Sequence, residues 1–290
     1  MTGNLCILLV SDVHADIAAL EAILRVSGSD AFRDRFGAPG RVVNLGDAVE
    51  RGYSPCEVID RMRAIRNLAS VRGNHDEAFV WNNPVSGSDS VSLAAHEECR
   101  ERGSWMDFFS GMEAFAMDRE ERLYFVHGGP VNPDRVCPPG ADLTESWLCS
   151  QTWQRISKTG ERYLDNSGYH YLPGDAFDEV RAALGAGFAV LCGHEHAEAV
   201  YREKDGRVED ILFGLDISYF EAGGRKVEEK RIALEEGANY LVRLGIAGPS
   251  GYYHLCGWDR CYFGVYRRDA EKRYISLLSF ALGRDTIPPK

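Results

Sequence analysis

The sequence predicts an α/β fold, and two observations carry this prediction. In the first third of the chain, short apolar runs alternate with helical patterns, as is typical of parallel strands joined by helices. From about Tyr201 onward one strand-like run follows another, which predicts a second, mainly antiparallel sheet. A chain of 290 residues is long enough for one large domain or for two small ones.

The first elements follow from periodicity and helix-start signals. Strands are expected at residues 5–10, 41–45 and 69–72, with a helix at 56–65. Apolar residues recur at helical spacing over 17–26, and Asp16 is placed to cap that helix. Strand–helix–strand alternation implies parallel pairing with right-handed crossovers. Two later strands of the same kind are expected at 123–126 and 189–192.

The remaining chain divides into an irregular part and a strand-rich part. Residues 130–175 are rich in Pro, Gly, Ser and Trp and show little periodicity, which predicts a long insertion near a functional face. The strand-rich part should hold strands at 211–215, 226–234, 240–244, 261–266 and 274–278.

Composition narrows the classes of function. The net charge of −11 argues against binding to duplex nucleic acid, because such proteins present basic surface to phosphates. A small phosphate substrate is still compatible, since a metal ion can supply local positive charge. We find no apolar run of transmembrane length and no signal peptide in MTGNLCILLV, so we expect a cytoplasmic protein without a membrane partner. The eight cysteines are scattered, with Cys256 and Cys261 as an isolated pair, and we expect reduced thiols.

Five of the predicted strands are each followed directly by residues that can bind a metal or a phosphate. The crevice outside the carboxyl ends of strands is where open α/β sheets bind ligands, so these five loops should converge. The blocks are Ser11-Asp12-Val13-His14, Gly46-Asp47, Gly73-Asn74-His75-Asp76, His127-Gly128-Gly129 and Gly193-His194-Glu195-His196.

Seven residues of these blocks, the candidate ligands, offer two carboxylates, one amide oxygen and four imidazoles. This is too many ligands for one tetrahedral zinc, and it suits two divalent ions that share a bridging ligand. A mixed nitrogen and oxygen shell is compatible with Mn, Fe, Co, Ni or Zn. Two such ions, roughly 3.5–4 Å apart, can clamp both oxygens of a phosphoryl transfer. The candidate ligands are Asp12, His14, Asp47, Asn74, His127, His194 and His196.

In this order the blocks resemble the calcineurin-like metallophosphoesterase superfamily, whose pattern is DxH, GDxx[D/E], GNH[D/E], a lone His and GHxH. The match runs from Asp12 to His196. SDVHADIAALEAIL resembles the bacterial predicted phosphodiesterase branch, while ERGYSPCEVI and FVHGG resemble serine/threonine phosphatases and diadenosine tetraphosphatases. The resemblance implies a β-sandwich of two mixed sheets flanked by helices, formed by a single domain over residues 1–290.

The resemblance also implies a role for each site residue. One metal would be held by Asp12, His14 and His196. The other would be held by Asn74, His127 and His194, with Asp47 bridging both ions, and Mn is the favoured metal. His75 would face the substrate and protonate the leaving oxygen or stabilise developing charge, with Asp76 orienting it. Arg51 matches a phosphate-gripping arginine, although an arginine after an acidic residue is also typical of a solvated ion pair.

Several other residues are expected to have a structural role rather than a role in the site. His96, His170 and His254 match no block and are expected to be structural or exposed, with lining of the pocket as the alternative for His170, which lies in the segment 130–175. Trp105, Trp147 and Trp153 are expected to pack in the core or the insertion, because no basic groove accompanies them.

The leading hypothesis is a metal-dependent phosphoesterase that hydrolyses phosphomonoesters or phosphodiesters with metal-activated water. The alternative is a non-catalytic metal-binding scaffold of the same fold that mediates protein interactions. The presence of His75 beside all seven ligands favours the enzyme. Small phosphate esters, nucleotides and phosphoproteins all stay open as substrates, and specificity is expected from residues 130–175 and the loop after Gly245.

Overall fold

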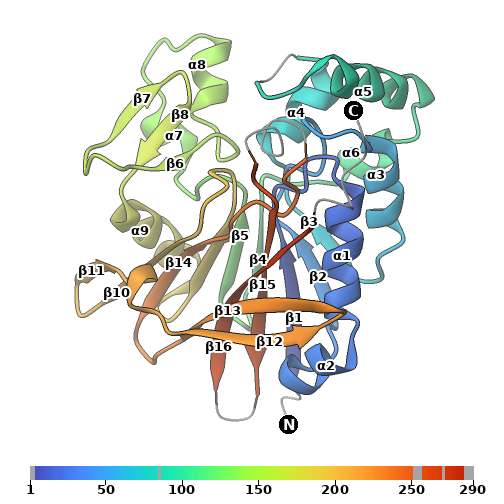
Figure 1. Cartoon of the computed structure of the whole chain (residues 1–290). Coiled ribbons are helices and arrows are strands. Elements are labelled where there is room, and N and C mark those ends of the chain that lie inside the picture. Colours follow the sequence, from blue (N-terminus) through green and yellow to red (C-terminus); the bar gives the residue numbers. More distant parts are fainter. Residues whose placement is uncertain (1–3, 84–85, 251–256, 270–271, 284–290) are drawn as a thin grey trace.

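Two mixed β-sheets stack face to face in the computed structural model, with helices on their outer faces (Figure 1). The structure describes residues 4–83, 86–250, 257–269 and 272–283. The α/β class and the sandwich of two mixed sheets flanked by helices, both predicted from the sequence, are confirmed.

The larger sheet has the strand order β12-β13-β16-β15-β1-β2-β3. Its parallel part is β1, β2 and β3, and β15 pairs antiparallel with the other edge of β1. The bounds are β1 Leu5–Val10, β2 Arg41–Asn44, β3 Leu68–Ser70, β12 Ile217–Ala222, β13 Arg225–Ala233, β15 Arg260–Arg268 and β16 Arg273–Ala281.

The smaller sheet has the order β11-β10-β14-β9-β5-β4, in which β14, β9 and β5 run parallel. A third, three-stranded sheet has the order β6-β8-β7. The bounds are β4 Phe115–Asp118, β5 Leu123–Val126, β6 Arg155–Ile156, β7 Tyr163–Asp165, β8 Gly168–Tyr171, β9 Ala189–Cys192, β10 Ala199–Lys204, β11 Arg207–Asp210 and β14 Asn239–Arg243.

The helices cover the outer faces of the sheets and the ends of the strands (Figure 1). On one side α1 and α3 pack against the larger sheet, and on the other α9 packs against the smaller one. The bounds are α1 Ile17–Ser27, α2 Asp30–Phe36, α3 Pro55–Arg63, α4 Asn74–Trp81, α5 Ser90–Arg102, α6 Met106–Ser110, α7 Pro133–Val136, α8 Leu143–Leu148, α9 Pro173–Leu184 and the 3₁₀ helix η1 Leu212–Gly214.

Strand β1 shows how alternation builds two layers of core at once. Ile7 and Leu9 point into the core between the sheets, whereas Leu8 and Val10 join the core beneath α1 and α3. Side chains of a strand alternate between faces, so a continuous apolar run marks a strand that is covered on both sides. The expected cap of α1 is also confirmed, because Asp16 accepts the N–H of Ala19 (2.9 Å).

The predicted allocation of strands to sheets is wrong. The strands after Tyr201 do not form a sheet of their own: β12, β13, β15 and β16 extend the sheet of β1, and only β10, β11 and β14 join β5 and β9. Apolar periodicity identifies a strand, but it does not tell which edge the strand pairs with, because pairing is a long-range contact.

Two local predictions also need correction. The strand predicted at 211–215 is instead the 3₁₀ helix η1, whose first N–H, that of Leu212, is accepted by Asp210 (3.0 Å). The segment 130–175 holds α7, α8, the three-stranded sheet and the start of α9 rather than irregular chain. Strands of two to four residues are too short to show the alternation that reveals them in a sequence.

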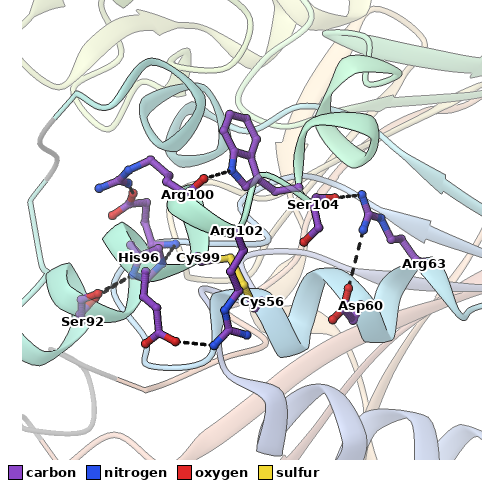
Figure 2. The surroundings of a disulfide bond; sticks show 12 residues. Cys56, Asp60, Arg63, Ser92, His96, Cys99, Arg100, Arg102 and Ser104 are labelled. Atoms are coloured by element: carbon purple, nitrogen blue, oxygen red, sulfur yellow. Dashed lines mark hydrogen bonds and ion pairs between the residues drawn. A yellow bond between two sulfur atoms is a disulfide. The ribbon is translucent and has the colours of Figure 1, made fainter.

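The prediction that all cysteines are reduced is wrong for one pair. Cys56 on α3 and Cys99 on α5 form a disulfide with their Cα atoms 5.5 Å apart (Figure 2). Their separation of 43 residues carries no spacing signal, so only the packing of the two helices reveals it. Free thiols are found at Cys6, Cys137, Cys149, Cys192 and Cys261, and Cys256 lies outside the described residues.

The disulfide bears on the predicted cellular location of the protein. Disulfides are rare in cytosolic proteins, so this pair counts against the cytoplasmic location, which stays a prediction. Within the part of the chain that the structure describes, no helix has the length and apolar character that a membrane span needs.

Replacing both cysteines, Cys56→Ser with Cys99→Ser, should lower the free energy of unfolding by roughly 2–4 kcal/mol, because the loop that the disulfide closes becomes free in the unfolded chain. Thermal unfolding with and without dithiothreitol measures this. Reductant should lower the Tm of the wild type and leave the double variant unchanged, with Cys137→Ser as the control. Equal thiol titres of the denatured wild type before and after reduction would contradict the disulfide.

Candidate active site

The five motif loops meet at one end of the sandwich. Three leave the carboxyl ends of β1, β2 and β3 in the larger sheet, and two leave β5 and β9 in the smaller sheet. Their side chains form two groups that could each hold a metal ion, with the ligand atoms of a group within 4.8 Å of one another. The site therefore lies where the two sheets adjoin, not at the edge of one sheet.

The first group consists of Asp12, His14, Asp47 and His196. Nε2 of His14 and Nε2 of His196 lie 3.0 Å apart, and Nε2 of His196 is 3.2 Å from Oδ1 of Asp12. Nitrogen and oxygen atoms that converge in this way form the inner face of a cation site.

The second group consists of Asp47, His127 and His194. Nε2 of His127 lies 3.1 Å from Oδ2 of Asp47 and 3.2 Å from Oδ1 of Asn74. Nε2 of His194 is buried and makes no hydrogen bond with any described residue. The structure thus brings together all seven residues that the sequence suggested as ligands.

Asp47 belongs to both groups, and its two oxygens have different surroundings. Oδ1 accepts the backbone N–H of His75 (2.9 Å), which fixes the carboxylate. Oδ2 is buried, accepts no hydrogen bond from any residue that the structure describes, and lies 3.8 Å from Nε2 of His14 and 3.1 Å from Nε2 of His127. Oδ2 therefore faces the ligands of both groups, as a bridging atom must.

Five of these seven residues have left-handed backbone. Their φ angles are 56° at Asp12, 47° at His14, 55° at Asp47, 72° at His194 and 62° at His196. A positive φ costs a non-glycine residue of order 1 kcal/mol or more, and such strain gathers at functional sites. Tight loops in this conformation turn the side chains back toward the ends of the strands.

Two glycines allow the loops to approach each other closely. A Cβ on Gly73 would lie 2.0 Å from Oδ1 of Asp47, and a Cβ on Gly193 would lie 1.8 Å from Oγ of Ser11. Only a residue without a side chain fits at either position. The glycines of the GNH and GHEH blocks are therefore required by packing against the neighbouring loop.

Backbone carbonyls select the imidazole atom that faces the site. Nδ1 of His127 donates to the carbonyl of Leu45 (2.7 Å), and Nδ1 of His14 lies 3.3 Å from the carbonyl of Val49. With the proton held at Nδ1, Nε2 carries the lone pair that a metal needs.

Burial and charge set the protonation states. Burial is the largest influence on the pKa of Asp47 and opposes its ionisation, but the surrounding histidines, His127 first among them, together outweigh burial and hold this pKa well below its usual range. The same pair acts on His127, where burial disfavours the charged form and Asp47 nevertheless raises the pKa to about 9. Burial lowers the pKa values of His14 and His194 well below normal, so both are neutral. Metal binding must therefore release a proton from His127.

The predicted role of Asp76 needs correction. Its carboxylate does not orient the His75 ring, whose Nδ1 is buried without a hydrogen bond among the described residues. Instead Oδ2 accepts the N–H groups of Asp47 and Gly73 (both 2.9 Å), and Oδ1 accepts the N–H of Ala48 (2.8 Å). Asp76 thus ties the loop after β2 to the start of α4, and it supports the backbone around Asp47 rather than the imidazole of His75.

Arg51 contacts two histidines of the site. Its Nη2 lies 3.1 Å from Nε2 of His75, and its Nη1 lies 3.4 Å from Nδ1 of His196. Burial, opposed by the Asp47 carboxylate, lowers the pKa of His75 to about 3, so this imidazole is neutral. A guanidinium and a neutral imidazole therefore stand side by side at the two groups.

The structure also places residues at the site that the sequence did not mark. A cleft of about 320 Å³ is lined by Arg51, Asn74, His75, Ser86, Trp147, Trp153, Arg155, Asn166, Ser167 and His194. Trp147, Trp153 and Arg155 come from the segment 130–175, and the two tryptophans line this cleft instead of only packing in the insertion. No motif precedes these three residues in the sequence, so the sequence carries no signal that they line the cleft.

The histidines outside the blocks behave as expected where they are described. His170 stacks on Tyr163 with ring centroids 4.0 Å apart and hydrogen-bonds Asp165, away from the cleft lining. His96 on α5 is fully buried and accepts the N–H of Glu50 (2.8 Å), next to Arg51. His254 lies outside the described residues, as do positions 251–256 of the loop after Gly245.

Comparison with known proteins identifies the family of the chain and finds solved structures with a similar fold. The model of the family described as calcineurin-like phosphoesterase matches residues 6–198. A metallophosphoesterase from Sphaerobacter thermophilus has a TM-score of 0.56 and 18% identity, and the match covers 94% of this chain and 86% of that chain. At this identity the likeness shows the fold alone.

Two further solved structures are less similar. Yfce, a phosphoesterase from E. coli, has a TM-score of 0.38 at 13% identity over 90% of this chain and 87% of its own. A hypothetical protein from Pyrococcus horikoshii has a TM-score of 0.37 at 16% identity over 59% and 77%. These two structures are too dissimilar to support a conclusion about fold or function. A search of curated proteins finds no match to the chain.

Acid should destabilise the fold through His96. Burial lowers its pKa to about 4, below the usual 6.5, so the unfolded chain binds the proton first as the pH falls. Its contribution is present above pH 6.5 and is lost between pH 6.5 and 4, at most about 3 kcal/mol. Urea unfolding at pH 7.5 and 4.5 measures this loss, which should be smaller in His96→Gln. An equal loss in both proteins would contradict it.

Proposed function

Because the chain belongs to the calcineurin-like phosphoesterase family, we propose that its site hydrolyses phosphomonoesters with water activated by two divalent metal ions. The observation that carries the proposal is that Asp47 belongs to both groups. Its Oδ2 accepts no hydrogen bond from the described residues and lies among the candidate ligands of both groups. Its substrate would be a small phosphate ester, with nucleotides and phosphoproteins as larger members of the same class.

The residues fit divalent metal ions. The donors are carboxylate, amide and imidazole groups without a thiol, a set that suits Mn²⁺ and also Fe, Co, Ni or Zn. Oδ2 of Asp47 and Nε2 of His194 are buried polar atoms that lack hydrogen bonds, which a cation would satisfy. When bound, two such ions neutralise phosphate charge and lower the pKa of water.

His75 and Arg51 would act on the substrate. A phosphate that enters the cleft would replace His75 as the partner of the Arg51 guanidinium, leaving Nε2 of His75 to face the ester oxygen. Burial keeps this imidazole neutral, and while Nε2 accepts from Arg51 its one proton lies at Nδ1. Once the phosphate has become the partner of Arg51, the tautomer with the proton at Nε2 would donate a hydrogen bond to the leaving oxygen and so stabilise its charge.

Two guanidinium groups favour monoesters over diesters. Arg51 and Arg155 both line the cleft, and the charge of Arg51, after burial, contributes to the lowered pKa of Arg155. Such mutual repulsion is relieved by an anion placed between them, and a doubly charged monoester relieves it more than a singly charged diester. Guanidinium forks also match the spacing of phosphate oxygens.

A non-catalytic scaffold of the same fold is the weaker alternative. Such a protein has no need for His75 and Arg51 to lie in contact beside a complete ligand set, with both side chains lining one cleft.

Turnover should depend on the metal and on His75. After EDTA treatment, Mn²⁺ should restore hydrolysis of p-nitrophenyl phosphate by the wild type, and His75→Ala should lower kcat by about 10²–10³-fold, because one donor that stabilises charge on the leaving oxygen is lost. Asp47→Asn should lose the Mn²⁺-dependent activity. Unchanged activity of Asp47→Asn would sink the shared-ligand assignment, and two bound metals without turnover on any ester would favour the scaffold.

The two arginines should affect monoesters more than diesters. Arg51→Ala and Arg155→Ala should each raise KM for p-nitrophenyl phosphate about tenfold or more, because each loses a charged hydrogen bond worth roughly 1.5–3 kcal/mol. The KM for bis-p-nitrophenyl phosphate should rise less. Exposed Arg119→Ala is the control, and equal changes with both substrates would argue against a monoester preference.

A further inference from the structure

One wall of the cleft belongs to residues 147–158, which we call the cleft wall. It contributes Trp147, Trp153 and Arg155 to the cleft lining, yet it is remote in sequence from every motif loop. The ring of Trp153 packs edge-on against His194 with centroids 5.9 Å apart, so the wall touches a candidate metal ligand. What holds this segment in place decides where Arg155 lies.

Glu77 holds the first end of the cleft wall. It directly follows Asp76 on α4, and its side chain is buried. Oε2 accepts the indole N–H of Trp147 (2.7 Å) and the hydroxyl of Thr152 (2.9 Å). One carboxylate oxygen therefore binds two residues of the wall to the helix that carries His75.

Glu195 holds the other end. It stands between the candidate ligands His194 and His196, and its Oε2 accepts the backbone N–H of Ile156 (3.2 Å). The same carboxylate forms ion pairs with Arg243 and with Lys158, whose Nζ lies 3.4 Å from Oε1. The bond to Ile156 fixes the residue next to Arg155 relative to the GHEH loop.

The burial of the Glu77 and Glu195 carboxylates is energetically unfavourable and calls for a physical explanation. Neither belongs to a candidate metal group in the described chain, and a buried carboxylate costs several kcal/mol unless partners compensate it. Their side chains are only 9% and 5% exposed, for Glu77 and Glu195 respectively. Glu77 directly follows the GNHD block and Glu195 lies within the GHEH block. Both carboxylates accept hydrogen bonds from the cleft wall.

We propose that Glu77 and Glu195 are positioning residues that clamp the cleft wall to the two motif loops and so set the place of Arg155 beside the phosphate site. The proposal rests on the proposed function and identifies the residues that fix its substrate contacts. Without the clamp, the wall would retain its own small sheet, but Arg155 would no longer be held at a fixed distance from His75 and His194.

The test combines hydrogen exchange with kinetics on the full chain. Glu77→Ala and Glu195→Ala each remove one end of the clamp, whereas Glu77→Gln keeps an acceptor for Trp147 and Thr152. Glu161→Ala, an exposed carboxylate between β6 and β7, is the matched control. Exchange of peptides from residues 147–158 reports the wall directly, and bound Mn²⁺ is measured for every variant.

Each alanine variant should speed exchange in the wall about tenfold or more while α1 keeps its protection, since a lost charged hydrogen bond is worth roughly 1.5–3 kcal/mol. KM for p-nitrophenyl phosphate should rise about tenfold with a smaller change in kcat. In an Arg155→Ala background, Glu195→Ala should add little further to KM, because the group it positions is gone. Glu77→Gln and Glu161→Ala should resemble the wild type.

Three results would overturn the proposal. Unchanged exchange in residues 147–158 would show that no clamp exists. A KM increase that is as large without Arg155 as with it would remove the positioning role. Loss of Mn²⁺ without faster exchange would assign Glu195 to the metal loop alone.

Two further outcomes, a variant that does not fold and a wild type without esterase activity, need a separate measurement. If Glu195→Ala leaves Arg243 unpaired and fails to fold, Trp147→Phe and Thr152→Val remove the donors at the Glu77 end instead, with the same expected exchange. If the wild type hydrolyses neither nitrophenyl ester, the proposed function fails. The clamp is then judged by exchange and by calorimetric binding of inorganic phosphate to the Mn²⁺-loaded variants, and unchanged values in both would overturn it.

Discussion

The buried carboxylate of Asp47 is the constraint on which the rest of the structure depends. It carries a negative charge in the interior, where desolvation costs several kcal/mol, and within the described part of the chain only its Oδ1 accepts a hydrogen bond, from the N–H of His75. The other oxygen faces imidazoles that come from both sheets. The charge is tolerated only if cations meet it, so the two sheets must bring their loops to this one atom.

Much of the surrounding strain follows from that requirement. Loops that must turn side chains back onto Asp47 take left-handed backbone, and Gly73 must lack a side chain because its Cα lies against the carboxylate. Asp76 pins the backbone on both sides of the contact through three N–H groups. Burial of apolar side chains elsewhere offsets the free-energy cost of this strain, chiefly in strands such as β1 that are covered on both faces.

The sequence predicted what is local and failed where contacts are long-range. Strands β1, β5 and β9 and the ligand blocks that follow β1, β2, β3, β5 and β9 could be identified, because buried runs and motif spacing are written in consecutive residues. The sheet that each late strand joins, the Cys56–Cys99 disulfide and the cleft position of Arg155 depend on partners tens of residues away. Asp76 was misassigned for the same reason, since its partners lie on another loop.

Charge distribution joins the fold to the choice of substrate. The chain as a whole is acidic, at −11, so it repels polyanions from a distance. Salt screens that repulsion beyond roughly 8 Å, and within this range a phosphate meets Arg51, Arg155 and the metal-binding groups instead. A ligand with one compact charged group can enter such a cleft, whereas a long polyanion must place its remaining charges against the acidic surface. If the proposed function holds, this reversal of charge between the surface and the cleft would favour small phosphomonoesters, and the placement of Arg155 would contribute to selectivity.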